Sequence, residues 1–159
     1  MKVTTTRGFS LVEVLVVIAI LAIVLTIAVP NFKKYIHNTN LKSAGRELAG
    51  DILNIKQTAV AQGVHYKVLL SQSGNNYIIV KGGPNSNDVY DYANEITKQL
   101  SDFASYVTIN SVNYTSDQIV FQQRGTTSAG NVTLINDIGS TMKITSNLMG
   151  KVSVDYTPK

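Results

Sequence analysis

The hydrophobic positions of this sequence follow three different patterns along the chain. Residues 14–29 read VLVVIAILAIVLTIAV, with Thr26 as the single polar residue. Apolar residues then return every three or four positions between residues 41 and 59, and from Val64 onward they alternate with polar residues. A long apolar run, a 3.6-residue period and a two-residue period are typical of a membrane-spanning helix, an amphipathic helix and β-strands, respectively.

The apolar run is long enough to cross a bilayer. A helix over residues 9–29 would be about 31 Å long at 1.5 Å per residue, which matches a hydrocarbon core of about 30 Å. Because Lys2 and Arg7 precede the run, a cleavable secretory signal with a cut near Ala28 is one alternative. Glu13 argues against it, since a carboxylate within an apolar stretch is costly and an ordinary signal has no use for one.

Residues 30–62 are predicted to continue the helix with only one apolar face. Pro30 lacks a backbone N–H and is therefore predicted to kink the helix near its middle. The charged residues of this half lie opposite the apolar stripe, which should bury against a globular head. The stripe consists of Leu41, Ala44, Leu48, Ile52, Ile55 and Ala59.

The rest of the chain is predicted to form a small β-structure. Turn residues 74–76 separate the first two runs of β-forming residues, which indicates a hairpin. Residues 82–94 are expected to form a loop, and residues 95–105 a short helix or an irregular crossing. The predicted strands cover residues 64–70, 77–80, 106–109, 118–121, 131–135, 141–145 and 151–154. The expected fold class is therefore α+β, with a long N-terminal helix packed on a small antiparallel β-sheet or β-sandwich head.

The composition argues against most enzyme chemistry. The 159 residues include no cysteine and two histidines, so thiolate metal sites, a cysteine nucleophile and a three-histidine metal site are excluded. No convergent set of catalytic residues and no phosphate loop is recognisable. We therefore expect no catalytic activity, no cofactor and no metal. His37 has no second histidine or carboxylate at helical spacing, and His65 is expected to be a strand side chain.

The residues around the start of the apolar run carry a recognisable motif. Residues 7–15 read RGFSLVEVL, and this segment, together with the apolar run, resembles the type IV pilin-like family of pilins and type II secretion pseudopilins. The resemblance implies that a prepilin peptidase cleaves after Gly8 and that Phe9 becomes the methylated amino terminus. It also implies that Glu13 acts in assembly and that Pro30 is the helix-kinking proline.

The last third of the chain is similar to a subgroup of this family, the GspH/FimT-type minor pilins and minor pseudopilins. The segments Ile119-Val120-Phe121, Arg124-Gly125 and Val132-Thr133-Leu134 carry this similarity. The implied division is a leader at 1–8, a helix at 9–62 with a transmembrane or filament-core part at 9–29 and an amphipathic part at 30–62, and a head at 63–159.

The resemblance also implies location and partners. The chain would be a single-pass protein of the inner, cytoplasmic membrane with its head outside the cytoplasm, and later a subunit of a pilus or pseudopilus. Its partners would be other pilin or pseudopilin subunits, the prepilin peptidase and N-methyltransferase, and the inner-membrane assembly platform. The predicted function is a minor pilin or minor pseudopilin; a major pilin, or a DNA-binding minor pilin in natural transformation, is the alternative.

Charge gives DNA binding little support. The formal net charge is +4, but residues 63–159 hold seven Lys or Arg against seven Asp or Glu, so the head is neutral. A phosphate-binding surface needs clustered cations, and near the carboxyl end the head offers only Lys143, Lys151 and Lys159. DNA binding therefore stays an alternative with weak support from the sequence.

Two further candidate sites lie around the predicted loop. Its oxygen-bearing side chains suit calcium in type but lack the spacing of a known calcium loop. Tyr90, Tyr92 and Tyr106 are expected to bury their rings and expose their hydroxyl groups, and not to form a contact surface. The calcium candidates are Asn85, Asn87, Asp88, Asp91 and Glu95.

Overall fold

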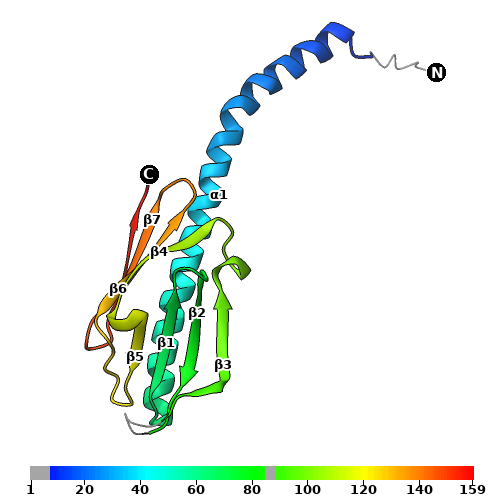
Figure 1. Ribbon diagram of the computed structural model, residues 1–159. Helices are drawn as coiled ribbons and strands as arrows, with labels where there is room; N and C mark the ends of the chain where they lie inside the picture. The colour runs from blue at the N-terminus through cyan, green and yellow to red at the C-terminus, as the bar shows by residue number, and fades with distance from the viewer. Residues whose placement is uncertain (1–7, 85–88) are drawn as a thin grey trace, which may run out of the picture. The chain divides into compact units, whose positions relative to one another are not determined.

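The computed structural model describes residues 8–84 and 89–159 and divides into two compact units, which meet between Tyr35 and Ile36. Helix α1 (Leu11–Gln62) contributes to both units, and every other named element belongs to the second (Figure 1). These elements are β1 (Tyr66–Ser71), β2 (Asn76–Lys81), β3 (Asp91–Gln99), η1 (Leu100–Asp102), β4 (Val107–Asn113), η2 (Thr115–Asp117), β5 (Gln118–Phe121), β6 (Gly130–Asn136), β7 (Thr141–Ser146) and β8 (Val152–Thr157).

The carboxyl end of α1 is closed by its own backbone. The N–H of Val64 donates to the carbonyl oxygen of Ala59 at 3.1 Å, and the N–H of Gly63 donates to that of Val60 at 3.3 Å. Gly63 has a φ of 63°, the left-handed conformation that glycine adopts without a Cβ clash. This pair of bonds is a Schellman motif, which satisfies terminal carbonyl groups and turns the chain into β1.

Two antiparallel sheets form the head. Sheet A has the strand order β3-β2-β1-β5 and sheet B the order β4-β6-β7-β8. The first hairpin pairs Val68 with Ile79 and Leu70 with Tyr77, which places these apolar side chains on the buried face. The sequence-predicted fold class, a long helix on a small antiparallel β head, is confirmed.

One hydrophobic core joins α1 to both sheets. All six residues of the predicted helix stripe are buried, and Gly45 and Ala49 join them. A Cβ on Gly45 would lie 2.3 Å from the sulfur of Met142, so this glycine lets α1 approach sheet B closely. The sheets contribute, among others, Val68, Leu70, Tyr77, Ile79, Ile119 and Phe121 from sheet A, and Val107, Ile109, Val132, Leu134, Met142 and Ile144 from sheet B.

The prediction for the middle of the head was wrong. Residues 95–105 were expected to form a helix or an irregular crossing, and residues 91–94 a loop, whereas β3 runs from Asp91 to Gln99 and only η1 is helical. β3 is one of the two outer strands of sheet A, and its residues 91–97 are exposed, so no alternation marks it in the sequence. Pairing with β2, which sets Ile96 opposite Ile79, is what makes this segment a strand.

We predict opposite effects of alanine at two glycines. A Cβ on Gly130 would lie 2.4 Å from the backbone oxygen of Asn113, so Gly130→Ala should lower the free energy of unfolding by about 1–3 kcal/mol. Gly50 has open space around it on α1, and Gly50→Ala should raise the free energy of unfolding by about 0.5–1 kcal/mol. Urea unfolding of the full-length chain in detergent, followed by circular dichroism, measures both variants. Unchanged stability of Gly130→Ala would contradict the predicted clash between its Cβ and the backbone oxygen of Asn113.

Candidate functional site

Helix α1 begins with a capping contact next to the predicted cleavage site. Ser10 Oγ accepts the backbone N–H of Glu13 at 3.3 Å, and α1 starts at Leu11. Ser10 and Glu13 have the spacing of a capping box, in which a serine N-cap is paired with an acidic residue three positions later. Sequence reasoning assigned Glu13 to assembly and missed the capping of its backbone N–H by Ser10, which the spacing of the two residues could have revealed.

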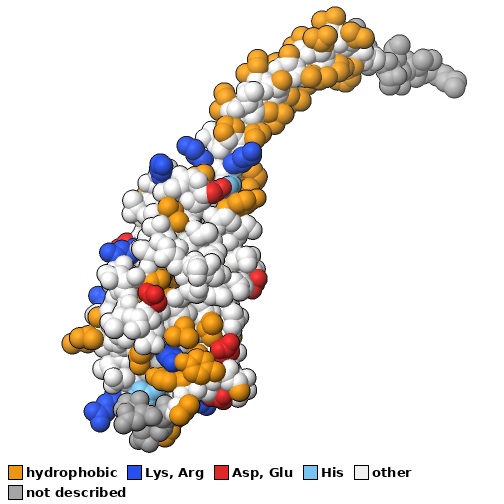
Figure 2. Space-filling view, viewed as in Figure 1, with side chains coloured by type: hydrophobic (Ala, Val, Ile, Leu, Met, Phe, Trp, Pro, Cys, Tyr) orange, Lys and Arg blue, Asp and Glu red, His pale blue; other side chains and the backbone are white. Residues whose placement is uncertain are grey.

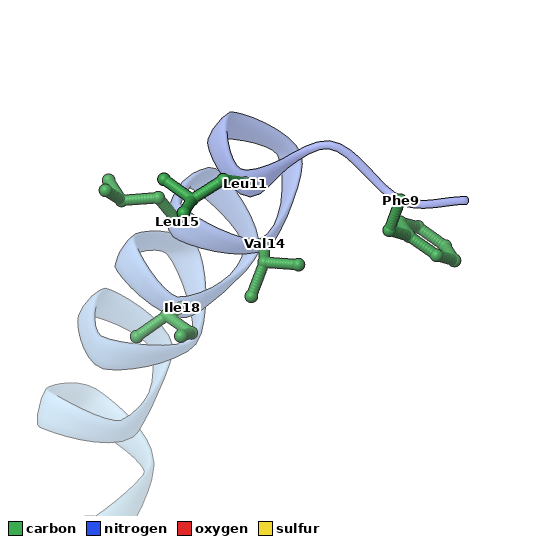
Figure 3. A pocket seen from close by; sticks show the side chains of 5 residues that line it. All are labelled: Phe9, Leu11, Val14, Leu15 and Ile18. Atoms are coloured by element: carbon green, nitrogen blue, oxygen red, sulfur yellow. The ribbon is translucent and has the colours of Figure 1, made fainter.

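The first turns of α1 present an apolar surface. Phe9, 81% exposed, precedes the helix, and the residues that follow it at helical spacing line an open hollow (Figure 3). In Figure 3 the side chains of Phe9 and Val14 extend to the same side, while Leu11 and Leu15 lie next to each other. Glu13 lies on the other side of the helix from Leu11 and Leu15, since each residue turns the helix by about 100°. The hollow is lined by Phe9, Leu11, Val14, Leu15 and Ile18.

The helix continues unbroken through Pro30. Pro30 cannot donate a backbone hydrogen bond to the carbonyl group one turn earlier. Two nearby side chains add hydrogen bonds to other carbonyl oxygens of the helix: Thr26 Oγ1 donates to Ile23 at 2.5 Å, and Asn31 Nδ2 donates to Ile27 at 3.0 Å. The kink predicted at Pro30 stays a prediction.

The first unit buries none of its described side chains. Residues 8–35 are all exposed, and α1 is long and apolar enough there to cross a membrane. A helix that is apolar on all sides requires an apolar environment, either lipid or other protein. Gly8 is described and open, whereas Lys2 and Arg7 of the leader lie outside the described residues.

A polar network links α1 to sheet A in the second unit. The hydroxyl group of buried Tyr77 donates to Asp51 Oδ2 at 2.5 Å, and Lys98 Nζ lies 2.7 Å from Asp51 and 3.0 Å from Glu47. Burial, and then the bond to Asp51, raise the pKa of Tyr77 far above its ordinary value. Burial alone would lower the pKa of Lys98, but the carboxylates of Asp51 and Glu47 outweigh it and raise that pKa.

His37 has structural partners that local spacing could not reveal. Its Nδ1 lies within hydrogen-bonding distance of the carboxylate of Asp137, which follows β6, and its ring stacks on Tyr106 with centroids 4.6 Å apart. One residue further along α1, the side chain of Asn38 accepts a hydrogen bond from Asn136 at 3.0 Å. His37 therefore anchors the start of the second unit's helix to sheet B. His65, expected in a strand, is buried just before β1.

Two of the three tyrosines around the predicted loop are more exposed than expected. Tyr92 and Tyr106 are 51% and 61% exposed, so the prediction that they bury their rings was wrong. Lys67 Nζ lies over the rings of Tyr90 and Tyr92, at 4.1 and 4.8 Å from their centroids.

The calcium loop is only partly described. Asn85, Asn87 and Asp88 lie outside the described residues. Asp91 accepts hydrogen bonds from the backbone of Ala93 and the side chain of Asn94. Within residues 8–84 and 89–159, no group of three or more acidic or histidine side chains could hold a metal ion.

Comparison with known families identifies both parts of the chain. The family described as "Type II transport protein GspH" matches residues 44–150, which is most of the second unit. The chain belongs to this family. The "Prokaryotic N-terminal methylation motif" matches residues 4–29, which contain the predicted cleavage site and the apolar run. None of the curated proteins is a match to this sequence.

Solved structures of a minor pseudopilin and a minor pilin share the fold. The minor pseudopilin EpsH from the type 2 secretion system of Vibrio cholerae is similar with a TM-score of 0.58 and 7% identity, over 74% of this chain and 97% of EpsH. The type IV minor pilin FimU of Pseudomonas aeruginosa is similar with a TM-score of 0.53 and 15% identity, over 76% of this chain and 92% of FimU.

These findings confirm the predicted function class. The chain is a structural subunit of the minor pseudopilin or pilin kind, with a prepilin leader, in type II secretion or a type IV pilus. The findings do not favour the alternatives, a DNA-binding minor pilin or a major pilin. The apolar helix and the methylation motif indicate membrane anchoring with a separate head, and membership of the family implies assembly with other pilin-like subunits.

We predict that Tyr77→Phe lowers the free energy of unfolding by an amount that depends on pH. At pH 7 the variant should lose about 0.5–1.5 kcal/mol of unfolding free energy, because Asp51 loses a donor. Folding raises the pKa of Tyr77, so its stabilisation is complete below pH ~10, where the unfolded phenol keeps its proton, and is lost at higher pH. The difference between wild type and variant should therefore narrow from pH 10 to 11. Urea unfolding across this range measures it, and a constant difference would contradict the assignment.

Proposed function

We propose that the chain is cleaved after Gly8 and methylated on Phe9 by a prepilin peptidase with N-methyltransferase activity. Residues 9–29 then hold it in the inner membrane, with the head outside the cytoplasm, until an assembly platform moves it into a filament. The observation that carries this proposal is the fully exposed apolar surface of residues 9–29, which lies within the segment that matches the methylation motif. Such a surface requires lipid at one stage and can be covered by neighbouring helices at another.

Glu13 is proposed to set the position of each subunit's helix along that of its neighbour. Cleavage after Gly8 creates an ammonium group on Phe9, and Glu13 lies about one helical turn further along. A carboxylate in a low-dielectric environment requires a cationic partner, and the Phe9 ammonium of a neighbouring subunit supplies one. An apolar helix can slide along another at little cost, whereas this ion pair fits at only one position.

The proposed function is mechanical and not catalytic. Helix packing over residues 9–29 replaces lipid contacts, and Pro30 allows local unwinding because one hydrogen bond of the helix is already missing there. The head then determines which partners the subunit meets. We propose no catalytic residue, cofactor or metal for this chain.

We predict that the charge of Glu13 matters more for incorporation into filaments than the capping of its backbone N–H by Ser10. Glu13→Gln keeps a side chain that can complete a capping box but removes the charge, and it should lower incorporation into filaments about tenfold, equivalent to ~1.4 kcal/mol. Ser10→Ala removes the cap acceptor and keeps the carboxylate, so it should reduce incorporation far less. Quantitative immunoblots of sheared filaments and of membranes measure both. Wild-type incorporation of Glu13→Gln, with normal membrane levels, would overturn the role of the charge.

We predict that Gly8→Glu blocks processing. A large charged side chain directly before the cut should exclude the segment from the peptidase, so the precursor with its leader should accumulate in the membrane. Mass spectrometry of the amino-terminal peptide distinguishes the uncut form from one that begins at methylated Phe9. The stoichiometry of that peptide to the most abundant pilin also separates a minor from a major subunit. An uncut amino terminus on the wild-type chain would contradict the proposed processing.

A further inference from the structure

The loop between β7 and β8 holds two apolar side chains rigidly in solvent. Leu148 is 67% exposed and Met149 is 83% exposed. The backbone around them is fixed: the side chain of Asn147 accepts the N–H of Met149 at 3.0 Å, and Lys56 Nζ donates to the carbonyl oxygens of Met149 and Gly150 at 3.2 and 3.1 Å. In Figure 2 hydrophobic side chains protrude at the left, where Figure 1 places this loop. We call Leu148 and Met149 the knob.

Positive charge surrounds the knob. Lys151 follows it in sequence, Lys56 lies beneath it, and Arg124 belongs to the loop before β6. The residue after Arg124, Gly125, lies against α1, since a Cβ there would be 3.7 Å from Lys56 Cε. Among the described residues, none of these three cations forms an ion pair within the chain. The knob therefore suits an apolar recess with an acidic border.

A recess of this kind lies between α1 and strand β3. Its volume is about 270 Å³, below the roughly 300–1,000 Å³ of small-molecule pockets, so it suits one or two side chains. Ile55 and Ile79 give it an apolar floor, and Ile96 remains 57% exposed at its edge. We call it the groove. It is lined by Asp51, Asn54, Ile55, Thr58, Tyr66, Ile79, Ile96 and Lys98.

The border of the groove is acidic. Asp51 and Glu47 share the single ammonium group of Lys98, which leaves one carboxylate charge in excess. Glu95 on β3 is exposed and adds negative charge at the same edge of sheet A, whereas the charge of Asp91 is offset by Lys81, which lies opposite it on β2. The groove thus has the charge opposite to that of the knob.

From this complementarity we infer that the knob of one copy of this chain inserts into the groove of a second copy. Lys56, under the knob, and Asn54 and Thr58, at the groove, point to nearly opposite sides of α1 at 100° per residue. The β7–β8 loop and β3 accordingly lie at opposite edges of the head in Figure 1. A contact between two different surfaces is heterologous, so a pair of copies leaves one free knob and one free groove. The inference rests on the proposed function, because it describes head contacts within an assembly.

Cysteine cross-linking of the full-length chain tests the contact. The sequence has no cysteine, so each introduced thiol is unique. Two tagged chains are expressed together in cells that form the filaments, one with Met149→Cys and one with Ile96→Cys, and then oxidised. We expect a mixed disulfide dimer at about ten times the yield of a control pair of Met149→Cys with Thr108→Cys, an exposed position on β4, since a disulfide requires Cα atoms within about 7 Å. Equal yields from the two pairs would overturn the inference.

Reversing one charge next to the knob tests the contact independently. Lys151→Glu in the Met149→Cys chain should reduce the yield of the mixed dimer about fivefold, whereas Lys143→Glu, an equal charge change away from the knob, should leave it unchanged. A cysteine-to-amine cross-linker on Met149→Cys identifies other occupants. A product with a different pilin-like subunit or with aminophospholipid, in place of a second tagged copy, would also overturn the inference.

The same cells separate this inference from the proposed function. Leader cleavage and filament incorporation are measured on the chains that are cross-linked. Processed and incorporated chains without the mixed dimer would refute the knob–groove contact alone. A mixed dimer from chains that never enter filaments would support the contact and contradict the proposed function, and failure of both measurements would refute both.

Discussion

The apolar stripe of α1 in the second unit is the constraint on which the head depends. Each sheet has four strands and one buried face, and the same helix stripe covers both faces. Small side chains in the stripe set how closely the sheets can approach, as Gly45 does beneath Met142. The Schellman motif at Gly63 ends the helix where β1 must begin. Changes in this stripe therefore affect both sheets together.

Before Ile36 the same helix has apolar side chains that the rest of the chain does not cover. Burial of one large apolar side chain contributes about 1.5–3 kcal/mol, and a whole domain is stable by only about 5–15 kcal/mol. The apolar side chains of residues 9–29 are exposed within the chain, so their burial has to come from outside it. The head completes its own core without them. This division lets the first unit exchange lipid for protein neighbours while the core of the head stays unchanged.

The sequence predicted those elements whose burial is periodic. In the stripe from Leu41 to Ala59 and in the strands of the two hairpins, buried positions recur at a regular period, and the structure has these elements. β3 was missed because, as an exposed outer strand, it has no alternation, and only its pairing with β2 defines it. The His37–Asp137 contact was missed because its members are 100 residues apart. The capping of Glu13 by Ser10 is local, and the capping-box spacing alone could have predicted it.

Apolar packing alone cannot order the subunits of the proposed assembly. Lipid tails are as apolar as leucine, so helices in a membrane gain little from apolar contact itself and associate through close packing and polar groups. Within residues 9–29 the one charged side chain is Glu13, which can fix how far one helix is displaced along the next but cannot distinguish between partners that carry the same amino terminus. Discrimination must therefore come from the heads, whose exposed charges and apolar residues differ from edge to edge. The affinity of a subunit for the assembly and its place within it thus depend on different parts of the chain.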